Sequence, residues 1–252
     1  GASELSIVGG GTFSNTNPIQ LDNASSKLTL SGIIASYVRT NSDSLGVVID
    51  DSAYINEFTV GHVTPVSISA NQSLDGVVDI YSKGNLKLNN SGTLSATVTV
   101  KGDSFGSGTV GGKIEVQETM TFSGLLQQTT DHNGLEIKID SGKTMTYTGS
   151  GFNISNHTLK LSGGGTFANT NNLTLNNSQS KLELGGASIS KVEINTALTN
   201  GELNISADST IESLSHTGTS RINLDANTSL TLTNPFEIPG GQTMEMVGVG
   251  TG

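Results

Sequence analysis

Apolar residues along this chain alternate with single polar residues in short runs. Examples are Leu28–Leu30, Val98–Val100, Ile137–Ile139 and Leu203–Ile205. A period of two places successive side chains on opposite faces of a strand, so each run predicts a strand of about three to five residues. Clusters of Gly, Asn, Asp and Ser separate the runs and are typical of turns. No segment has a convincing apolar stripe of helical period, and we predict an all-β chain.

Several of these runs are spaced by about 20 residues, a spacing typical of solenoid coils. The spacing is marked by Leu28, Val47, Val66, Leu86, Leu182, Leu203 and Ile222. A β-sandwich would place longer strands every 8–12 residues or so, whereas a solenoid needs short strands with a turn at each corner. We predict a parallel β-helix, or β-solenoid, of roughly 10–13 coils. A pair of β-sandwich domains joined near residue 158 is the alternative.

The chain contains a long internal repeat. Residues 5–32 and 159–186 align without a gap at an offset of 154 and share 16 of 28 residues, including GGGTF, NTN and the SKLxL ending. Residues 47–58 and 66–74 match 203–214 and 222–230 at an offset of 156. We predict that residues 1–158 form the first repeat unit and residues 159–252 a partial second unit continuous with it. This division suggests a piece of a longer tandem array.

The repeated GGGTF motif has two interpretations. A phosphate-cradling loop needs a Gly-Lys-Ser/Thr and a helix directly after it, and neither follows the motif. The motif therefore predicts a tight corner between strands, reused when a block of coils was duplicated.

Composition and charge narrow the class of partner. The formal net charge is −10, and the 12 basic residues are dispersed, so there is no electrostatic basis for binding nucleic acid. No apolar run approaches the length of a membrane span. The chain has no cysteine, which excludes disulfides and thiolate metal sites.

Candidate chemistry is sparse, and we predict that the chain is not an enzyme and holds no cofactor. The adjacent acids Asp50 and Asp51 are expected at a solvated corner. The histidines are far apart in sequence and are expected at the surface or in turns. They are His62, His132, His157 and His216. A scattered calcium site of Asp side chains and turn carbonyls stays open.

Threonines form one candidate surface. Thr-x-Thr pairs recur at 97–99, 119–121 and 144–146, at offsets of 22 and 25 residues. If these coils stack, Thr97, Thr99, Thr119, Thr121, Thr144 and Thr146 would form a flat ladder that orders water. Such rows resemble those of β-solenoid ice-binding proteins, although threonine is also common on exposed strands.

Short strands, coils rich in Gly, Asn, Ser and Thr, the absence of Cys and a long repeat resemble the β-helical passenger regions of bacterial autotransporters and related secreted surface adhesins. SGKTMTYTGSGF (141–152) is similar to the coil endings of those regions. The resemblance implies an extracellular location on the bacterial cell surface and a role as a rigid stalk or as a multivalent binding surface. The expected partners are adjacent repeats of the same chain and a glycan or protein on a host or neighbouring cell. Glycan binding or cleavage along a β-helix groove is the alternative function.

Overall fold

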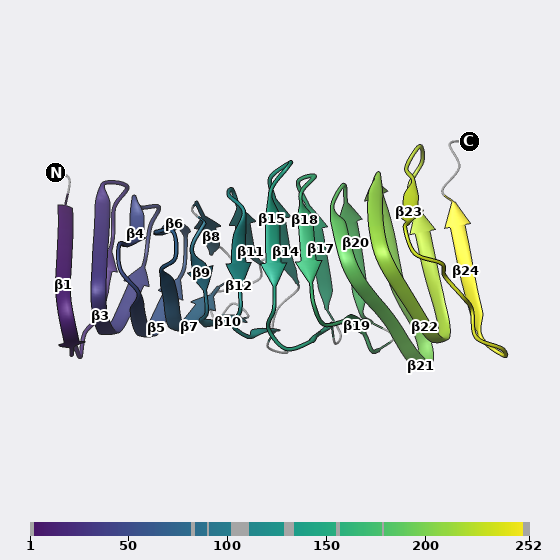
Figure 1. Ribbon diagram of the computed structural model, residues 1–252, viewed down its shortest axis with the longest axis horizontal. Helices are drawn as coiled ribbons and strands as arrows, with labels where there is room; N and C mark the ends of the chain where they lie inside the picture. Colours follow the sequence, from purple (N-terminus) through teal and green to yellow (C-terminus); the bar gives the residue numbers. More distant parts are fainter. Residues whose placement is uncertain are drawn as a thin grey trace. The chain divides into compact units, whose positions relative to one another are not determined.

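The computed structural model describes residues 3–81, 84–89, 91–101, 111–128, 134–154, 157–177 and 179–248, and for residues 195–201 and 219 it describes the backbone alone. The described residues form strands and turns without a helix, so the all-β prediction is confirmed (Figure 1). The strands pair in parallel as a β-solenoid of about 10 turns, which confirms the predicted β-helix and excludes the two sandwiches. Among these residues there is no helix that could span a membrane.

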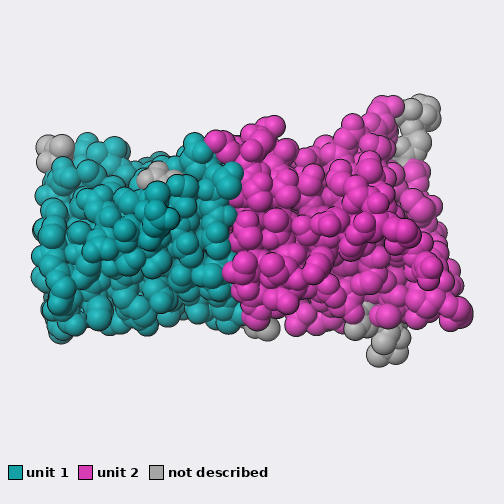
Figure 2. All heavy atoms as spheres, viewed as in Figure 1, with its two compact units in different colours: residues 1–132 teal, residues 133–252 magenta. Residues whose placement is uncertain are grey.

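The chain divides into two compact units, residues 1–132 (unit 1) and residues 133–252 (unit 2), which Figure 2 colours separately. The boundary of the sequence repeat, between 158 and 159, falls inside unit 2 within β17 (Thr158–Ser162). This strand pairs with β14 (Leu135–Ile139) on one side and with β20 (Lys181–Gly185) on the other. The repeat is therefore a period of the sequence, and strand pairing continues across its boundary.

Each coil of unit 1 contributes strands to three rows, which we call the first, second and third faces in chain order. The first face holds β1 (Ser3–Phe13), β3 (Ser26–Thr40), β4 (Gly46–Ile49), β6 (Val63–Ile68), β8 (Asn85–Leu88) and β11 (Gly112–Val116). The second face holds the later parts of β1 and β3, then β5 (Ala53–Val60), β7 (Ser73–Ile80), β9 (Thr93–Leu94) and β12 (Met120–Phe122). The third face holds β2 (Ile19–Leu21), the ends of β3, β5 and β7, β10 (Thr97–Val100) and β13 (Leu126–Gln128).

The strands of unit 2 also pair in three rows, which we name in the same way, by chain order within unit 2. Its first face holds β14, β17, β20, the ends of β21 (Ser188–Ala207) and β22 (Ser209–Leu224), and β24 (Thr243–Gly248). Its second face holds β15 (Thr144–Tyr147), β18 (Thr166–Asn169), the starts of β21 and β22, and β23 (Leu230–Leu232). Its third face holds β16 (Phe152–Ile154), β19 (Leu173–Leu175) and the middle parts of β21 and β22.

Some strands are much longer than the alternating runs suggest. β3 has 15 residues and β21 has 20, because the backbone stays extended around the corners and one strand serves two or three faces. The prediction of uniformly short strands is wrong for these coils. Alternation marks where a side chain points inward, and it is interrupted at a corner even when the strand continues.

The core is made of aliphatic side chains stacked from coil to coil. Leu28 pairs in register with Val47, Val47 with Val66, and Val66 with Leu88, and all four are at most 1% exposed. The sequence spacing placed Leu86 in this stack, but Leu86 aligns with Thr64, and the partner of Val66 is Leu88, two positions further along. Burying one such side chain contributes about 1.5–3 kcal/mol, so each coil is stabilised by its neighbours above and below.

The second GGGTF motif forms a corner, as the sequence predicts. Gly163, Gly164 and Gly165 lie between β17 and β18, and the first two have φ of 97° and 79°, which favours glycine. A Cβ on Gly165 would lie 2.4 Å from Cγ2 of Ile139 and 2.6 Å from the carbonyl oxygen of Asp140. The preceding coil therefore leaves no room for a side chain at this corner.

The NTN sequence that follows GGGTF joins consecutive coils at the next corner. The Asn169 amide donates to the carbonyl oxygens of Asn171 and Lys191 at 2.8 and 2.6 Å. Its Oδ1 accepts from the backbone N–H groups of Ser190 and Lys191 at 3.2 and 3.1 Å. Asn169 is 3% exposed, and its side chain satisfies four part-buried backbone groups of its own coil and the next.

The first copy repeats this arrangement. The Asn15 amide donates to the carbonyl oxygens of Asn17 and Tyr37 at 2.8 and 2.7 Å, and its Oδ1 accepts from the backbone of Ser36 and Tyr37. The shared NTN motif is therefore explained by coil-to-coil hydrogen bonding of its first asparagine.

Candidate functional site

The first face of unit 1 carries ion pairs between successive coils. Glu4 and Lys27 are in register on β1 and β3, and their charged groups lie 2.9 Å apart. Lys87 and Glu115 are in register on β8 and β11, at 3.4 Å, and Lys113 approaches the other oxygen of Glu115 at 2.8 Å. Lys27, Lys87, Lys113 and Glu115 occupy outward positions of their strands, because their neighbours along each strand are buried.

Glu115 has the most enclosed carboxyl group of these pairs, with 13% of its side chain exposed. Burial by itself raises the pKa of this carboxyl. The hydrogen bond from Lys113 and the positive charges of Lys113 and Lys87 outweigh burial, so the pKa of Glu115 is held below its usual value. Glu115 is therefore ionised at neutral pH.

The first face of unit 2 carries two rows of alternating charge. In one row, Lys181, Glu202, Arg221 and Glu245 follow one another in register on β20, β21, β22 and β24. Lys181 lies 3.1 Å from Glu202, and Arg221 lies 3.6 Å from Glu245.

The neighbouring row begins with Glu136, Lys160 and Glu183, which are in register on β14, β17 and β20. Lys160 lies 3.2 Å from Glu183. The row continues with Asn204 and Asn223, whose side-chain amides hydrogen-bond at 2.7 Å. We call the charged residues of the first face in both units the charge ladder. Its members are Glu4, Lys27, Lys87, Lys113, Glu115, Glu136, Lys138, Lys160, Lys181, Glu183, Glu202, Arg221 and Glu245.

The charge ladder has structural consequences but no evident catalytic ones. Exposed pairs of this kind contribute about 0.2–1 kcal/mol each, and salt screens them. The pKa of Glu115 is lowered, whereas a general acid at neutral pH needs a raised pKa. Within unit 2 the ladder presents charged groups in successive coils, whereas in unit 1 the strands β4 and β6, between Lys27 and Lys87, carry no charged residue.

The sequence contains a second pattern, separate from the alternation of apolar residues, that indicates the charge ladder. Oppositely charged residues stand one coil apart, as Glu4 and Lys27 do at an offset of 23 residues. Once a coil length is known, this offset identifies residues that are neighbours on one face.

The structure distributes the six candidate threonines over different strand rows. In unit 1, Thr97 and Thr99 lie on the third face, in register with Val77 and Asp79. Thr121 lies on the second face in register with Thr93, and Thr119 is exposed just before β12. In unit 2, Thr144 and Thr146 lie on the second face, in register with Thr166 and Ala168. The structure thus does not bring Thr97 and Thr99 into the row that holds Thr121.

Thr99 is also enclosed by polar neighbours. It is 6% exposed, and its Oγ1 accepts a hydrogen bond from Gln127 at 2.9 Å. Asp79, the next residue in its row, is 4% exposed and forms an ion pair with Lys101. The hydrogen bond with Asp79 raises the pKa of Lys101. This part of the third face is a hydrogen-bonded polar row and not an open threonine surface.

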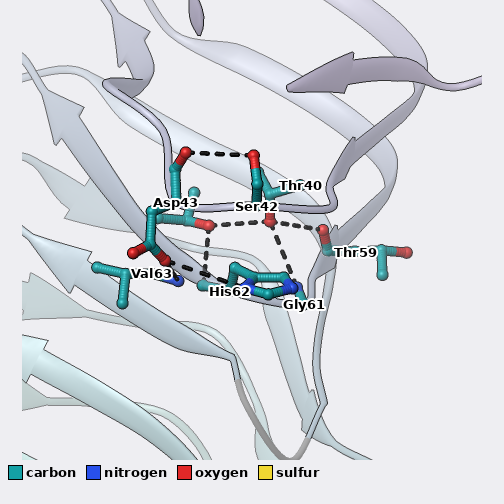
Figure 3. A network of polar contacts seen from close by, with 8 residues as sticks. Thr40, Ser42, Asp43, Thr59, Gly61, His62 and Val63 are labelled. Carbon is teal, nitrogen blue, oxygen red and sulfur yellow. Dashed lines mark hydrogen bonds and ion pairs between the residues drawn. The ribbon is translucent and has the colours of Figure 1, made fainter. Parts of the chain in front are cut away.

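Figure 3 shows a corner between the third and first faces where Ser42, Asp43 and His62 lie together. Nδ1 of His62 is 4.0 Å from Oδ1 of Asp43, and that Oδ1 also accepts from the backbone N–H of Val63 at 3.2 Å. Ser42 Oγ donates to the carbonyl oxygen of Asp43 at 3.3 Å. A serine nucleophile needs its hydroxyl aimed at a base about 2.6–3.2 Å away. The hydrogen bonds drawn in Figure 3 stabilise the corner instead.

The other acidic and histidine candidates fall mostly where the sequence placed them. Asp50 and Asp51 are exposed at the corner between β4 and β5, as predicted. His62 is partly exposed in a turn, and His157 is partly exposed next to β17. His132 lies outside the described residues. In the part of the chain that the structure describes, no group of three or more His, Cys, Asp or Glu residues could hold a metal ion.

His216 contradicts the surface prediction. It is 3% exposed on β22, in register with Ile194, and neither ring nitrogen has a hydrogen-bond partner among the described groups. Burial lowers the pKa of this imidazole, because the charged form is poorly solvated there. Val60 occupies the position 156 residues earlier in the first copy, and it is fully buried. The periodic pattern at this position signals an inward side chain, whereas the residue type suggests the surface.

Compared with protein-family models, with curated proteins and with solved structures, the chain has no significant match. The fold and the repeat define its class directly: this is a β-solenoid repeat protein.

Proposed function

We propose that this chain is a non-enzymatic, extracellular structural or adhesive repeat segment of a large bacterial surface protein. The charge ladder is the observation that carries the proposal. Cations of the first face lie against carboxylates of a neighbouring coil, as Lys160 does with Glu183 and Lys181 with Glu202. In unit 2 such charged elements recur in successive coils, which suits weak contacts made many times over.

The stalk part of the proposal rests on how one coil is joined to the next. Parallel backbone pairing holds consecutive coils on three faces, and the corner asparagines Asn15 and Asn169 add bonds between coils. Aliphatic stacks fill the interior. Separating two coils breaks all of these contacts together, so a segment of this kind resists extension until a whole coil gives way.

Single-molecule force spectroscopy tests the stalk. With the full chain tethered at both ends, we expect stepwise lengthening by about 70 Å for each coil of roughly 20 residues, since an extended residue spans about 3.3–3.6 Å. Smooth extension at low force, without coil-sized steps, would contradict a load-bearing role.

A second set of measurements tests the adhesive part and its alternative. Beads carrying many copies of the chain are expected to bind bacterial or host cells more tightly than the soluble chain does, and salt should weaken binding that uses the charge ladder. The control is a chain with Lys160 and Lys181 replaced by Gln. A glycan array and a reducing-sugar assay address glycan binding and cleavage. Sugar release would overturn the non-enzymatic proposal.

A further inference from the structure

One edge of unit 1 exposes apolar side chains that the repeat buries elsewhere. β1 pairs with β3 along one side, and along β1 Leu5 is 44% exposed and Phe13 is 40% exposed. Their counterparts 154 residues later are Leu159 and Phe167, and both are fully buried. Two copies of one sequence motif thus stand in different surroundings.

The second copy shows what covers these positions. In unit 2, Leu159 and Leu161 of β17 pair with Leu135 and Ile137 of β14. The Phe167 ring stacks on Tyr147 of the same preceding coil, with centroids 5.8 Å apart. The coil of residues 134–154 therefore supplies both the strand and the aromatic ring that bury the motif.

The glycines give an independent indication. In the second copy, a Cβ on Gly163 would lie 2.4 Å from the carbonyl oxygen of Ile139, and a Cβ on Gly165 would lie 2.4 Å from the Ile139 side chain. Around Gly9, Gly10 and Gly11 of the first copy, an added Cβ meets nothing within 4 Å. The first copy thus has the same three glycines, but no described part of the chain packs closely against them.

We propose that the free edge of β1 is a docking surface for a further coil of this repeat, with the sequence and backbone path of residues 134–154. In that complex a Leu135 equivalent pairs with Leu5, an Ile137 equivalent pairs with Ile7, and a Tyr147 equivalent covers Phe13. The Ile139–Asp140 backbone equivalent passes over the glycine corner. The occupant is a coil of another copy of the repeat unit, and the inference does not depend on an adhesive or a stalk role.

The test extends the full chain at its N-terminus. Residues 134–158 replace residues 1–4 directly before Leu5, so that Leu5 takes the sequence position of Leu159. We expect hydrogen exchange of β1 amides to slow by about tenfold or more, which corresponds to about 1.4 kcal/mol in local opening free energy. Hydrogen exchange of the β17 amides in the same molecule is the reference, because β17 is paired along both of its edges.

A matched substitution distinguishes docking from a general effect of the added residues. Gly11→Val is expected to be tolerated in the unextended chain, because its side chain enters open space. In the extended chain the same Val meets the added coil, so the tenfold protection is lost. Gly165→Val in the unextended chain, which meets Ile139, should be destabilising in the same way.

A register control lacks one residue at the junction, which turns the apolar side chains of the added coil outward. This chain should leave β1 exchange unchanged. Equal protection in the matched and shifted chains, or no slowing in the matched chain while β17 stays protected, would overturn the docking surface. Tolerance of Gly11→Val in the extended chain would also contradict the proposed backbone path.

Discussion

Replacing His216 by Val is expected to stabilise unit 2 and to remove a pH dependence. The imidazole is buried on β22 without a hydrogen-bond partner among the described groups. A buried polar group left in this state costs about 1–3 kcal/mol. Valine has no polar atom to desolvate, and the first copy already uses Val60 at the corresponding position. We therefore expect the free energy of unfolding at pH 7 to rise by about 1–3 kcal/mol.

The pH dependence follows from the lowered pKa of His216. In the unfolded chain a histidine takes up a proton below about pH 6.5. The buried imidazole does so only at lower pH, because burial lowers its pKa. Below about pH 6.5 the unfolded state thus binds more protons, and stability falls by up to about 1.4 kcal/mol per pH unit until the folded pKa is reached. Above this window the contribution is constant.

Urea denaturation followed by circular dichroism between pH 5 and pH 7.5 measures both effects. His62→Gln is the matched control, because His62 is partly exposed at a corner. We expect its stability curve to differ from that of the unsubstituted chain by less than about 0.5 kcal/mol. If His216→Val shows the same fall in stability toward pH 5 as the unsubstituted chain, burial of an uncharged imidazole is refuted as the cause.

Three further predictions concern the joints between coils. Asn169→Ala is expected to cost about 1–3 kcal/mol in denaturation experiments, because the part-buried backbone groups bonded by its buried side chain lose their partners. Asn15→Ala should cost less, since Asn15 is partly exposed, and equal losses would contradict the role of burial. Glu115→Gln should cost about 1 kcal/mol or less at pH 7. Folding lowers the pKa of the Glu115 carboxyl. Its contribution to stability is therefore present above the unfolded pKa of about 4.3 and disappears as the pH falls through the folded pKa. A variant whose stability differs equally from that of the unsubstituted chain at pH 3 and pH 7 would refute this linkage. Phe167→Ala, which removes the ring stacked on Tyr147, should cost about 3–5 kcal/mol by thermal or urea unfolding, and a cost below 1 kcal/mol would show that the neighbouring coils close the cavity.

The fold could be predicted in outline because its main signals are local. Alternation identifies the inward side chains of a strand, and Gly, Asn and Asp clusters identify corners. The spacing of Leu28, Val47 and Val66 gave the coil length, and the structure confirms these three as one stack. Fold class and coil spacing can be predicted because they follow from residue patterns that are visible along the chain itself.

The faces on which side chains meet could not be predicted in the same way. The register between coils depends on the number of residues at every corner in between, so Leu88, two positions further along, takes the place expected of Leu86. The same dependence placed Thr99 beside Asp79 and separated it from the row of Thr121. Small errors in corner length accumulate, and a sequence without a known register leaves such rows undetermined.

The sequence by itself determined that this protein is an all-β repeat with glycine corners, because period and turn chemistry act over a few residues. The tertiary structure decided which charges form the charge ladder, that His216 is buried and what each glycine corner faces. Gly11 and Gly165 stand in the same motif, yet a backbone covers only Gly165. Contacts between residues more than 20 positions apart arise when coils stack, and stacking sets their distances and their exposure to solvent.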